Sequence, residues 1–163
     1  MRIFLTGGTG FIGRALVPLL QREGHTVVVW SRSERRARAR LGADIEVVST
    51  DPAVDLSGVL ERCDAVVNLA GEPILGGRWT PRRKAVLTSS RVGVTERLVE
   101  AMARAARRPR VFISGSAVGY YGDRGSASLP EATNRGDGFL ADLDRKSTRL
   151  NSSHTDISRM PSS

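Results

Sequence analysis

Two kinds of hydrophobic pattern alternate along the chain. Five short apolar runs, several of them rich in β-branched residues, have the length of buried strands: residues 2–6, 26–30, 45–49, 65–69 and 111–114. Four intervening stretches are predicted helices, the longer ones with apolar residues every three or four positions: residues 11–23, 34–41, 56–62 and 81–107. This alternation predicts an α/β fold with a parallel sheet, because each helix returns the chain to the next strand.

Proline and glycine positions refine the helix boundaries. Gly24 supplies a stop for the first helix, and Pro81 suits the first turn of the last one. Pro18 lies inside the first helix and should weaken or kink it, because proline has no N–H to donate. Residues 115–136 are rich in glycine and serine and predict a loop, after which residues 136–143 predict the start of a further helix.

Composition places the chain among ordinary globular proteins. Its 163 residues are enough for one domain with a core, and 40% are hydrophobic and 26% charged. No apolar run reaches membrane-spanning length, Met1 and Arg2 lead directly into a strand, and no metal site is predicted. The lone Cys63 excludes an intrachain disulfide and fits a reducing compartment, so a cytoplasmic location without a membrane partner is expected.

The formal net charge of +8 is carried mainly by arginine. The densest cluster directly follows the second strand: Arg32, Arg35, Arg36, Arg38 and Arg40. A nucleic-acid-binding surface would usually add aromatic stacking residues or a recognition motif, and neither is visible. We therefore interpret the cluster as a solvated helix face that also meets a phosphate, and expect no nucleic-acid partner.

The character of the sequence changes at Asp144. Residues 144–154 (DRKSTRLNSSH) resemble the translation of a common sequencing adapter, and residues 158–163 (SRMPSS) resemble its continuation in another frame. The ordinary alternative is a native, polar, disordered tail. We expect residues 144–163 to be a non-native disordered tail, and residues 1–143 to be the N-terminal part of a longer protein whose C-terminal part is missing.

The segment from Thr6 to Gly13 (TGGTGFIG) joins the first strand to the first helix. Gly7 allows a tight turn, Gly10 lets the backbone approach a pyrophosphate without a Cβ, and Gly13 permits close packing of the helix on the strand. The helix N-terminus then offers free N–H groups and a positive dipole end. A glycine triplet in this strand–turn–helix context predicts a dinucleotide-binding site, against the alternative of a merely structural turn.

The end of the second strand indicates which dinucleotide binds. Sites for NAD usually place an acidic residue there to bind the ribose 2′-hydroxyl, whereas an arginine suits the 2′-phosphate of NADP. This strand ends with Trp30, Ser31, Arg32 and Ser33, and no acidic residue occurs before Glu34. NADP is therefore expected in preference to NAD, unless Arg32 is only a surface arginine.

Several motifs together resemble the short-chain dehydrogenase/reductase superfamily in its extended, NAD-dependent epimerase/dehydratase-like branch. TGGTGFIG, NLAG (68–71) and SGSAVGYYG (114–122) are similar to three motifs of that branch. GEPI (71–74), Arg78-Trp79, Ser90-Arg91 and GDGFLADL (136–143) resemble an atypical epimerase-family subgroup whose members are about twice as long. The resemblance implies a Rossmann-type doubly wound parallel sheet of about five strands in the order 3-2-1-4-5.

The resemblance also implies roles for individual residues. Those expected near the cofactor follow the ends of the strands: Gly7, Thr9, Gly10, Phe11, Ile12, Gly13, Ser31, Arg32, Asp51, Leu69, Ala70, Gly71 and Ser114. Asp51 lies near where relatives contact adenine, and Leu69–Gly71 would pass beside the nicotinamide ribose. Ser116 matches the catalytic serine that hydrogen-bonds the substrate oxygen.

One catalytic feature of the superfamily is missing. Its tyrosine base, in a Tyr-x-x-x-Lys motif, is expected around Phe139–Leu143, where this chain has neither residue. Phenylalanine cannot exchange a proton. Tyr120 or Tyr121 could substitute, although tyrosines of this kind are more often buried structural residues. Glu72 could act as an acid or base, or could anchor the loop of Arg78 and Trp79.

These features predict an NADP-dependent oxidoreductase or epimerase-like enzyme that acts on a small hydroxylated substrate, such as a sugar nucleotide. The missing tyrosine and lysine leave a second hypothesis, a non-catalytic NADP-binding sensor or scaffold. The 163-residue chain itself is expected to be weakly stable and inactive. Its oligomeric state cannot be predicted from the sequence.

Overall fold

The computed structural model describes residues 1–75 and 77–153, with side chains described as far as Thr148. Within that range the chain forms two compact units. The first consists of residues 1–71 and 97–115, and the second begins with residues 72–96 and continues from residue 116. Each unit combines two segments that are distant in the sequence, so contacts between these segments hold the unit together.

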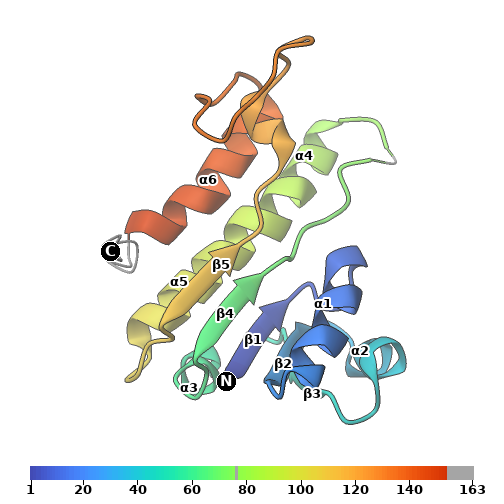
Figure 1. Cartoon of the computed structure of the whole chain (residues 1–163), viewed down its shortest axis with the longest axis vertical. Helices are drawn as coiled ribbons and strands as arrows, with labels where there is room; N and C mark the ends of the chain where they lie inside the picture. The colour runs from blue at the N-terminus through green and yellow to red at the C-terminus, as the bar shows by residue number, and fades with distance from the viewer. Residues whose placement is uncertain (76, 154–163) are drawn as a thin grey trace. The chain divides into compact units, whose positions relative to one another are not determined.

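A five-stranded sheet in the order β3-β2-β1-β4-β5 forms the first unit (Figure 1). The strands are β1 (Arg2–Thr6), β2 (Thr26–Ser31), β3 (Glu46–Ser49), β4 (Ala65–Asn68) and β5 (Val111–Ser114). All neighbouring pairs are parallel, and Thr6, Asn68 and Ser114 lie side by side in register. The carboxyl ends of the strands therefore meet at one edge, and the predicted Rossmann-type sheet and strand order are confirmed.

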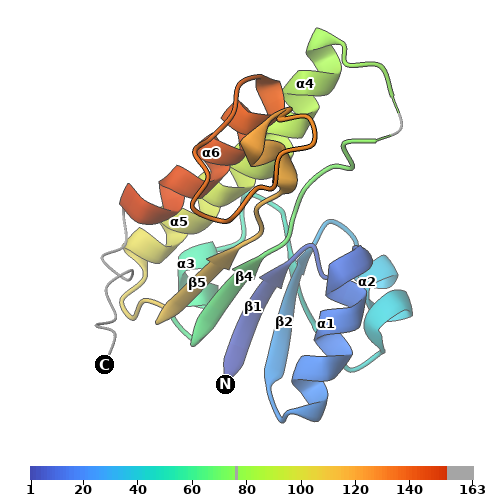
Figure 2. The same cartoon turned by 45° about the horizontal axis from the view of Figure 1, so that its top comes forward.

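Helices cover both faces of this sheet. α1 (Phe11–Arg22) and α2 (Glu34–Leu41) lie on one face, whereas α3 (Leu56–Leu60) and the part of α5 (Val94–Arg104) in this unit lie on the other (Figures 1 and 2). The α1–α2 face buries alternate strand residues together with helix residues: Ile3, Leu5, Val17, Val27, Val29, Ile45, Ala65 and Val67. On the other face Phe4, Val28 and Val66 are fully buried. Burial on both faces explains why the strands read as continuous apolar runs.

The second unit contains mainly helices. They are α4 (Pro81–Thr88), the π-helical turn η1 (Ser89–Gly93), the first residues of α5, the 3₁₀ turn η2 (Val118–Tyr121) and α6 (Phe139–Ser153). The Thr80 hydroxyl accepts a bond from the Arg83 N–H at 3.2 Å and Pro81 follows, which makes a well-formed helix start. The ring of Phe139 packs edge-on against Trp79, with centroids 5.7 Å apart.

Two predicted helices differ from the observed ones. The helix predicted over residues 81–107 is divided by η1 and ends at Arg104, because the wider turn interrupts the α-helical spacing. α1 continues through Pro18. Its apolar face holds it in place, since Val17 is fully buried and Leu16 and Leu20 pack against the core.

The expectation of a disordered tail is wrong for residues 144–153, which continue α6. Leu143, Asp144 and Ser147 are buried, and the Ser147 hydroxyl donates to the carbonyl of Asp144 at 3.0 Å. Arginine, lysine and leucine in this stretch are good helix formers, so a helix begun at Phe139 can be extended through it. Residues 154–163 lie outside the described residues, and the non-native origin of the tail stays a prediction.

Asp64 joins the amino ends of β1 and β4. Its Oδ2 accepts the backbone N–H of Arg2 at 2.7 Å, and its Oδ1 lies 3.4 Å from the guanidinium of Arg107. These two contacts, the backbone bond first, lower the pKa of Asp64 below its ordinary value of 3.8. Folding therefore favours the charged carboxylate.

We predict that Asp64→Asn lowers the free energy of unfolding at pH 7. A carboxyl whose pKa is lowered by folding contributes stability above its unfolded pKa, and that stability is lost as the pH falls through the folded pKa. The difference between wild type and Asp64→Asn should therefore shrink below about pH 4. Urea unfolding from pH 7 to pH 2.5 measures it, with the exposed Asp44→Asn as control. A difference that stays constant over this range would contradict the prediction.

Candidate functional site

The Gly-rich turn after β1 lies directly against the end of β4. Gly7 has φ +69°, and a Cβ there would lie 2.5 Å from the carbonyl oxygen of Leu69. Both the left-handed backbone and the close approach therefore require glycine at this position. A Cβ on Gly13 would lie 2.5 Å from backbone atoms of Gly7 and Gly8. The close contact that Gly13 permits is therefore with the turn itself, and not with the strand as was expected from the sequence.

α1 begins without a side-chain cap. Gly10 is its N-cap in an extended conformation, and the Gly10 carbonyl accepts the N–H of Arg14 at 3.1 Å. The N–H groups of residues 11–13 precede that first intrahelical bond. The side chains of Phe11 and Ile12 are 89% and 60% exposed. An exposed helix start of this kind can bind an anion through its amides and dipole.

The end of β2 presents Ser31 and Arg32 to solvent. The Ser31 hydroxyl bonds the N–H and the carbonyl of Ser33, both at 3.2 Å, and fixes the turn. The Ser33 hydroxyl accepts the N–H of Arg36 at 3.3 Å as the N-cap of α2, so it is engaged in a structural bond. Arg32 directly follows β2, and its side chain is exposed.

The rest of the arginine cluster divides into structural and exposed members. Arg38 pairs with Glu34 at 2.9 Å, as expected for neighbours on one helix face. Arg40 donates to the carbonyl of Thr9 at 3.1 Å and so ties α2 to the Gly-rich turn. This contact was not predicted, because the two residues are 31 positions apart and the cluster had been treated as one solvated face.

Asp51, one of the predicted cofactor residues, follows β3 and is exposed. Its Oδ1 accepts the N–H of Ala53 at 2.8 Å, and its own N–H bonds the Ser49 hydroxyl at 3.1 Å. This local turn orients the carboxylate just beyond the strand end.

A buried polar network joins the ends of β1, β4 and β5. The hydroxyl of Thr6 donates to Oδ1 of Asn68 at 2.6 Å and accepts the N–H of Ala70 at 3.1 Å. The Asn68 amide nitrogen lies 3.5 Å from the Ser114 hydroxyl, and the Asn68 carbonyl accepts the N–H of Gly115 at 2.9 Å. The network fixes the segment Leu69–Gly71 beside the Gly-rich turn, so the predicted residues after β1, β4 and β5 are brought together.

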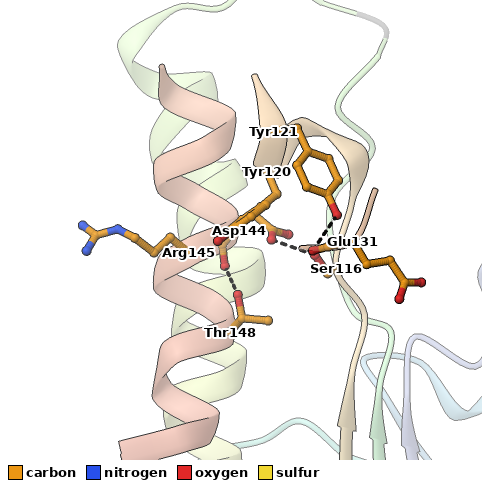
Figure 3. Close-up of a pocket in the computed structure, with 7 residues that line it drawn as sticks. All are labelled: Ser116, Tyr120, Tyr121, Glu131, Asp144, Arg145 and Thr148. Atoms are coloured by element: carbon orange, nitrogen blue, oxygen red, sulfur yellow. Dashed lines mark hydrogen bonds between the residues drawn. The ribbon is translucent and has the colours of Figure 1, made fainter. Parts of the chain in front are cut away.

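Ser116 belongs to the second unit and lines a cavity of about 590 Å³ (Figure 3). The cavity is lined by Ser116, Tyr120, Tyr121, Glu131, Asp144, Arg145 and Thr148. The Ser116 hydroxyl donates to Oδ2 of Asp144 at 2.7 Å, and Oδ1 accepts the N–H of Ala117 at 3.2 Å. The carboxylate thus holds Ser116 and its neighbour together, a contact that was missed because the sequence after Leu143 had been set aside.

The two tyrosines of η2 are half-buried and pack edge to face, with ring centroids 5.3 Å apart. The Tyr121 hydroxyl donates to the carbonyl of Glu131 at 3.5 Å (Figure 3). Ser116 and Tyr120 share the cavity, as the predicted catalytic set requires. Glu72 is not among the residues that line it.

Glu72 is instead part of a charged group near α4 and η1. It pairs with Arg83 at 3.3 Å, and its backbone N–H donates to the Ser90 hydroxyl at 3.0 Å. Burial lowers the pKa of Arg91, while Asp144 and Glu72 act in the opposite direction. This environment fits an anchoring carboxylate for the loop that follows β4.

Residues 3–139 match the NAD dependent epimerase/dehydratase family. The chain belongs to this family. An epimerase family protein of Arabidopsis thaliana, the chloroplastic SDR39U1 homolog, is 36% identical over 149 residues, which are 90% of this chain and 43% of that protein. YfhF of Bacillus subtilis, another epimerase family protein, is 36% identical over 75% of this chain and 39% of its own length.

Solved structures agree with the fold. Human SDR39U1 (isoform 2), crystallised with NADPH, matches with a TM-score of 0.74 and 30% identity over all of this chain and 50% of its own. A Bacillus cereus UDP-glucuronic acid 4-epimerase shares the fold with a TM-score of 0.77 at 22% identity, over 94% of this chain and 52% of its own. The chain thus spans about half or less of the length of each of these proteins.

We predict that Gly7→Ala destabilises the first unit far more than Gly24→Ala. Both glycines have a positive φ, which costs an alanine about 1–2 kcal/mol, but a Cβ on Gly24 meets no atom within 4 Å. Gly7→Ala adds the overlap with Leu69. Urea unfolding followed by circular dichroism compares the two, and equal losses would contradict the assigned close approach.

Proposed function

We propose that the first unit binds NADP and that the full-length protein is an oxidoreductase or epimerase-like enzyme acting on a small hydroxylated substrate. The observation that carries the proposal is the turn at Gly7, which places an uncapped helix start beside the ends of β1 and β4. Open amides and a positive dipole at such a turn suit a pyrophosphate.

The residues around the turn fit a dinucleotide. The cradle between Gly7, Gly13 and Leu69 exists only because two Cβ atoms are missing, and no bulky side chain replaces them. The residues proposed to hold the cofactor are Gly7, Thr9, Gly10, Phe11, Ile12, Gly13, Ser31, Arg32, Asp51, Leu69, Ala70, Gly71 and Ser114. All of them belong to the first unit, which contains the complete five-stranded sheet.

NADP is proposed in preference to NAD because Arg32 stands where an acidic residue would bind a ribose 2′-hydroxyl. A guanidinium can pair with a 2′-phosphate through two parallel hydrogen bonds. The 30% identical human relative, crystallised with NADPH, supports this choice. NAD remains the alternative, in keeping with the family description.

When bound, the nicotinamide accepts or returns a hydride. Ser116 is proposed to donate its hydroxyl proton to a hydrogen bond with the reacting substrate oxygen, in place of the bond to Asp144 seen here. Tyr120 lines the same cavity and is the proposed proton donor or acceptor. Glu72, paired with Arg83, is better suited to position the loop after β4 than to exchange protons.

The packing of Phe139 favours a second candidate, a non-catalytic NADP sensor or scaffold. Phe139 lies where the superfamily's tyrosine is expected, and its ring is held by Trp79 and by the ammonium group of Lys84, 5.3 Å from its centroid. Retained NADPH binding with no turnover in the full-length protein would favour the sensor. Turnover that Tyr120→Phe abolishes would favour the enzyme.

The substrate class and cellular location are also proposals. A sugar nucleotide is one small hydroxylated substrate that suits an epimerase-family protein. Within residues 1–75 and 77–153, no helix combines the length and hydrophobicity needed to cross a bilayer. We propose that the protein is cytoplasmic, acts on a small molecule and has no nucleic-acid partner. We also propose that the 163-residue chain is inactive and that its tail beyond Leu143 is non-native.

Arg32→Ala should weaken NADPH binding about 10- to 100-fold while leaving NADH binding nearly unchanged, because one charge-assisted pair to the 2′-phosphate is lost. Arg35→Ala, another exposed arginine of the same cluster, is the matched control. Isothermal titration calorimetry on the 163-residue chain measures both affinities. Equal losses for both nucleotides would remove the case for 2′-phosphate recognition, and no heat with either would overturn the proposed function.

A further inference from the structure

Arg97 of α5 lies on a tryptophan at the end of β2. Its guanidinium carbon is 4.7 Å from the centroid of the Trp30 ring. Phe4 of β1 also neighbours that ring, with centroids 6.2 Å apart. Trp30 is 6% exposed, so Arg97 contacts a ring that is almost fully buried. A partly desolvated cation over an indole is the stronger form of this contact.

The same two side chains hold the end of β3. The indole N–H of Trp30 donates to the Ser49 carbonyl at 2.9 Å, and the Arg97 guanidinium donates to the Thr50 carbonyl at 3.2 Å. Two consecutive carbonyls are thereby fixed immediately before Asp51. Since β2 also leads directly into Ser31 and Arg32, one stacked pair sets the ends of both strands.

Arg97 also lines a cavity of about 330 Å³. The other lining residues come from the segment after β3 and from α5: Pro52, Ala53, Val54, Asp55, Leu56, Ser57, Glu100 and Arg104. Its charged side chains are two acidic and two basic, so the cavity carries no strong net charge. Such a lining suits a neutral heteroaromatic ring with hydrogen-bonding edges better than a phosphate.

We propose that Arg97, placed over the ring of Trp30, forms the wall on which the adenine base of the nucleotide packs, and that it positions the adenosine half of the cofactor. A guanidinium group can stack on aromatic rings through its planar faces. The proposal rests on the proposed NADP binding. It adds a residue of α5 to a site otherwise built from strand ends and the Gly-rich turn.

The test uses 2′,5′-ADP, which carries the adenosine half of NADP without nicotinamide. Arg97→Ala should weaken 2′,5′-ADP and NADPH by the same factor, about tenfold, because the lost contact belongs to the half they share. Arg97→Lys keeps the charge but lacks the plane, and should also lose affinity. Arg108→Ala, an exposed arginine of the same unit that is not among the residues lining the cavity, should bind as wild type.

A spectroscopic readout separates this role from a general loss of structure. The chain has two tryptophans, so in a Trp79→Phe background the tryptophan emission comes from Trp30 alone. Binding of 2′,5′-ADP should change its emission, and Arg97→Lys should abolish most of that change while far-ultraviolet circular dichroism stays the same. Unchanged affinity for 2′,5′-ADP in both Arg97 variants would overturn this inference alone. Absence of any binding by wild type would overturn the proposed function as well.

Discussion

The absence of a side chain at Gly7 is the constraint on which the rest of the first unit depends. The backbone there passes so close to Leu69 that even a methyl group would overlap its carbonyl oxygen. This approach brings the turn after β1 against the segment after β4, and only then can the Thr6 hydroxyl reach both Asn68 and the N–H of Ala70. The start of α1 is left open as a consequence, since the residue before it has no side chain to cap it.

The polar groups at the strand ends are therefore organised before any ligand binds. Thr6 and Asn68 are buried, and unsatisfied polar atoms at such positions would be costly, so their mutual bonds fix the geometry of the turn. The stack of Arg97 on Trp30 does the same for β2 and β3. A site built this way needs little rearrangement to bind a long, flexible ligand, which reduces the entropic cost of binding.

Local sequence patterns predicted the fold because they show which residues are buried, and burial of apolar side chains is the main contribution to its stability. The β-branched run of β2 indicated a strand buried on both faces, and Val27, Val28 and Val29 are buried as expected. The spacing of Gly7, Gly10 and Gly13 likewise predicted the turn, since a left-handed backbone and close contacts select for glycine. Each of these signals is contained within a few neighbouring residues of the sequence.

Contacts between distant residues could not be predicted in the same way. The contacts of Arg40 with Thr9 and of Arg97 with Trp30 have no local signal, because only the fold brings these distant residues together. The π-helical turn at Ser89–Gly93 also has no local signal, because its residues are compatible with a regular helix. The cap that the Ser33 hydroxyl provides at the start of α2 was likewise not predicted.

Binding and catalysis place different demands on this chain. Every residue proposed to hold the cofactor belongs to the first unit, whose five-stranded sheet and core lie within residues 1–71 and 97–115. The proposed catalytic residues belong to the second unit, where Ser116 is held by Asp144, a residue of the segment proposed to be non-native. If residues 144–163 are non-native, the carboxylate of Asp144 accepts the hydrogen bond that the Ser116 hydroxyl would otherwise donate to the substrate. Nucleotide binding can then survive in the 163-residue chain while turnover requires the native continuation of α6.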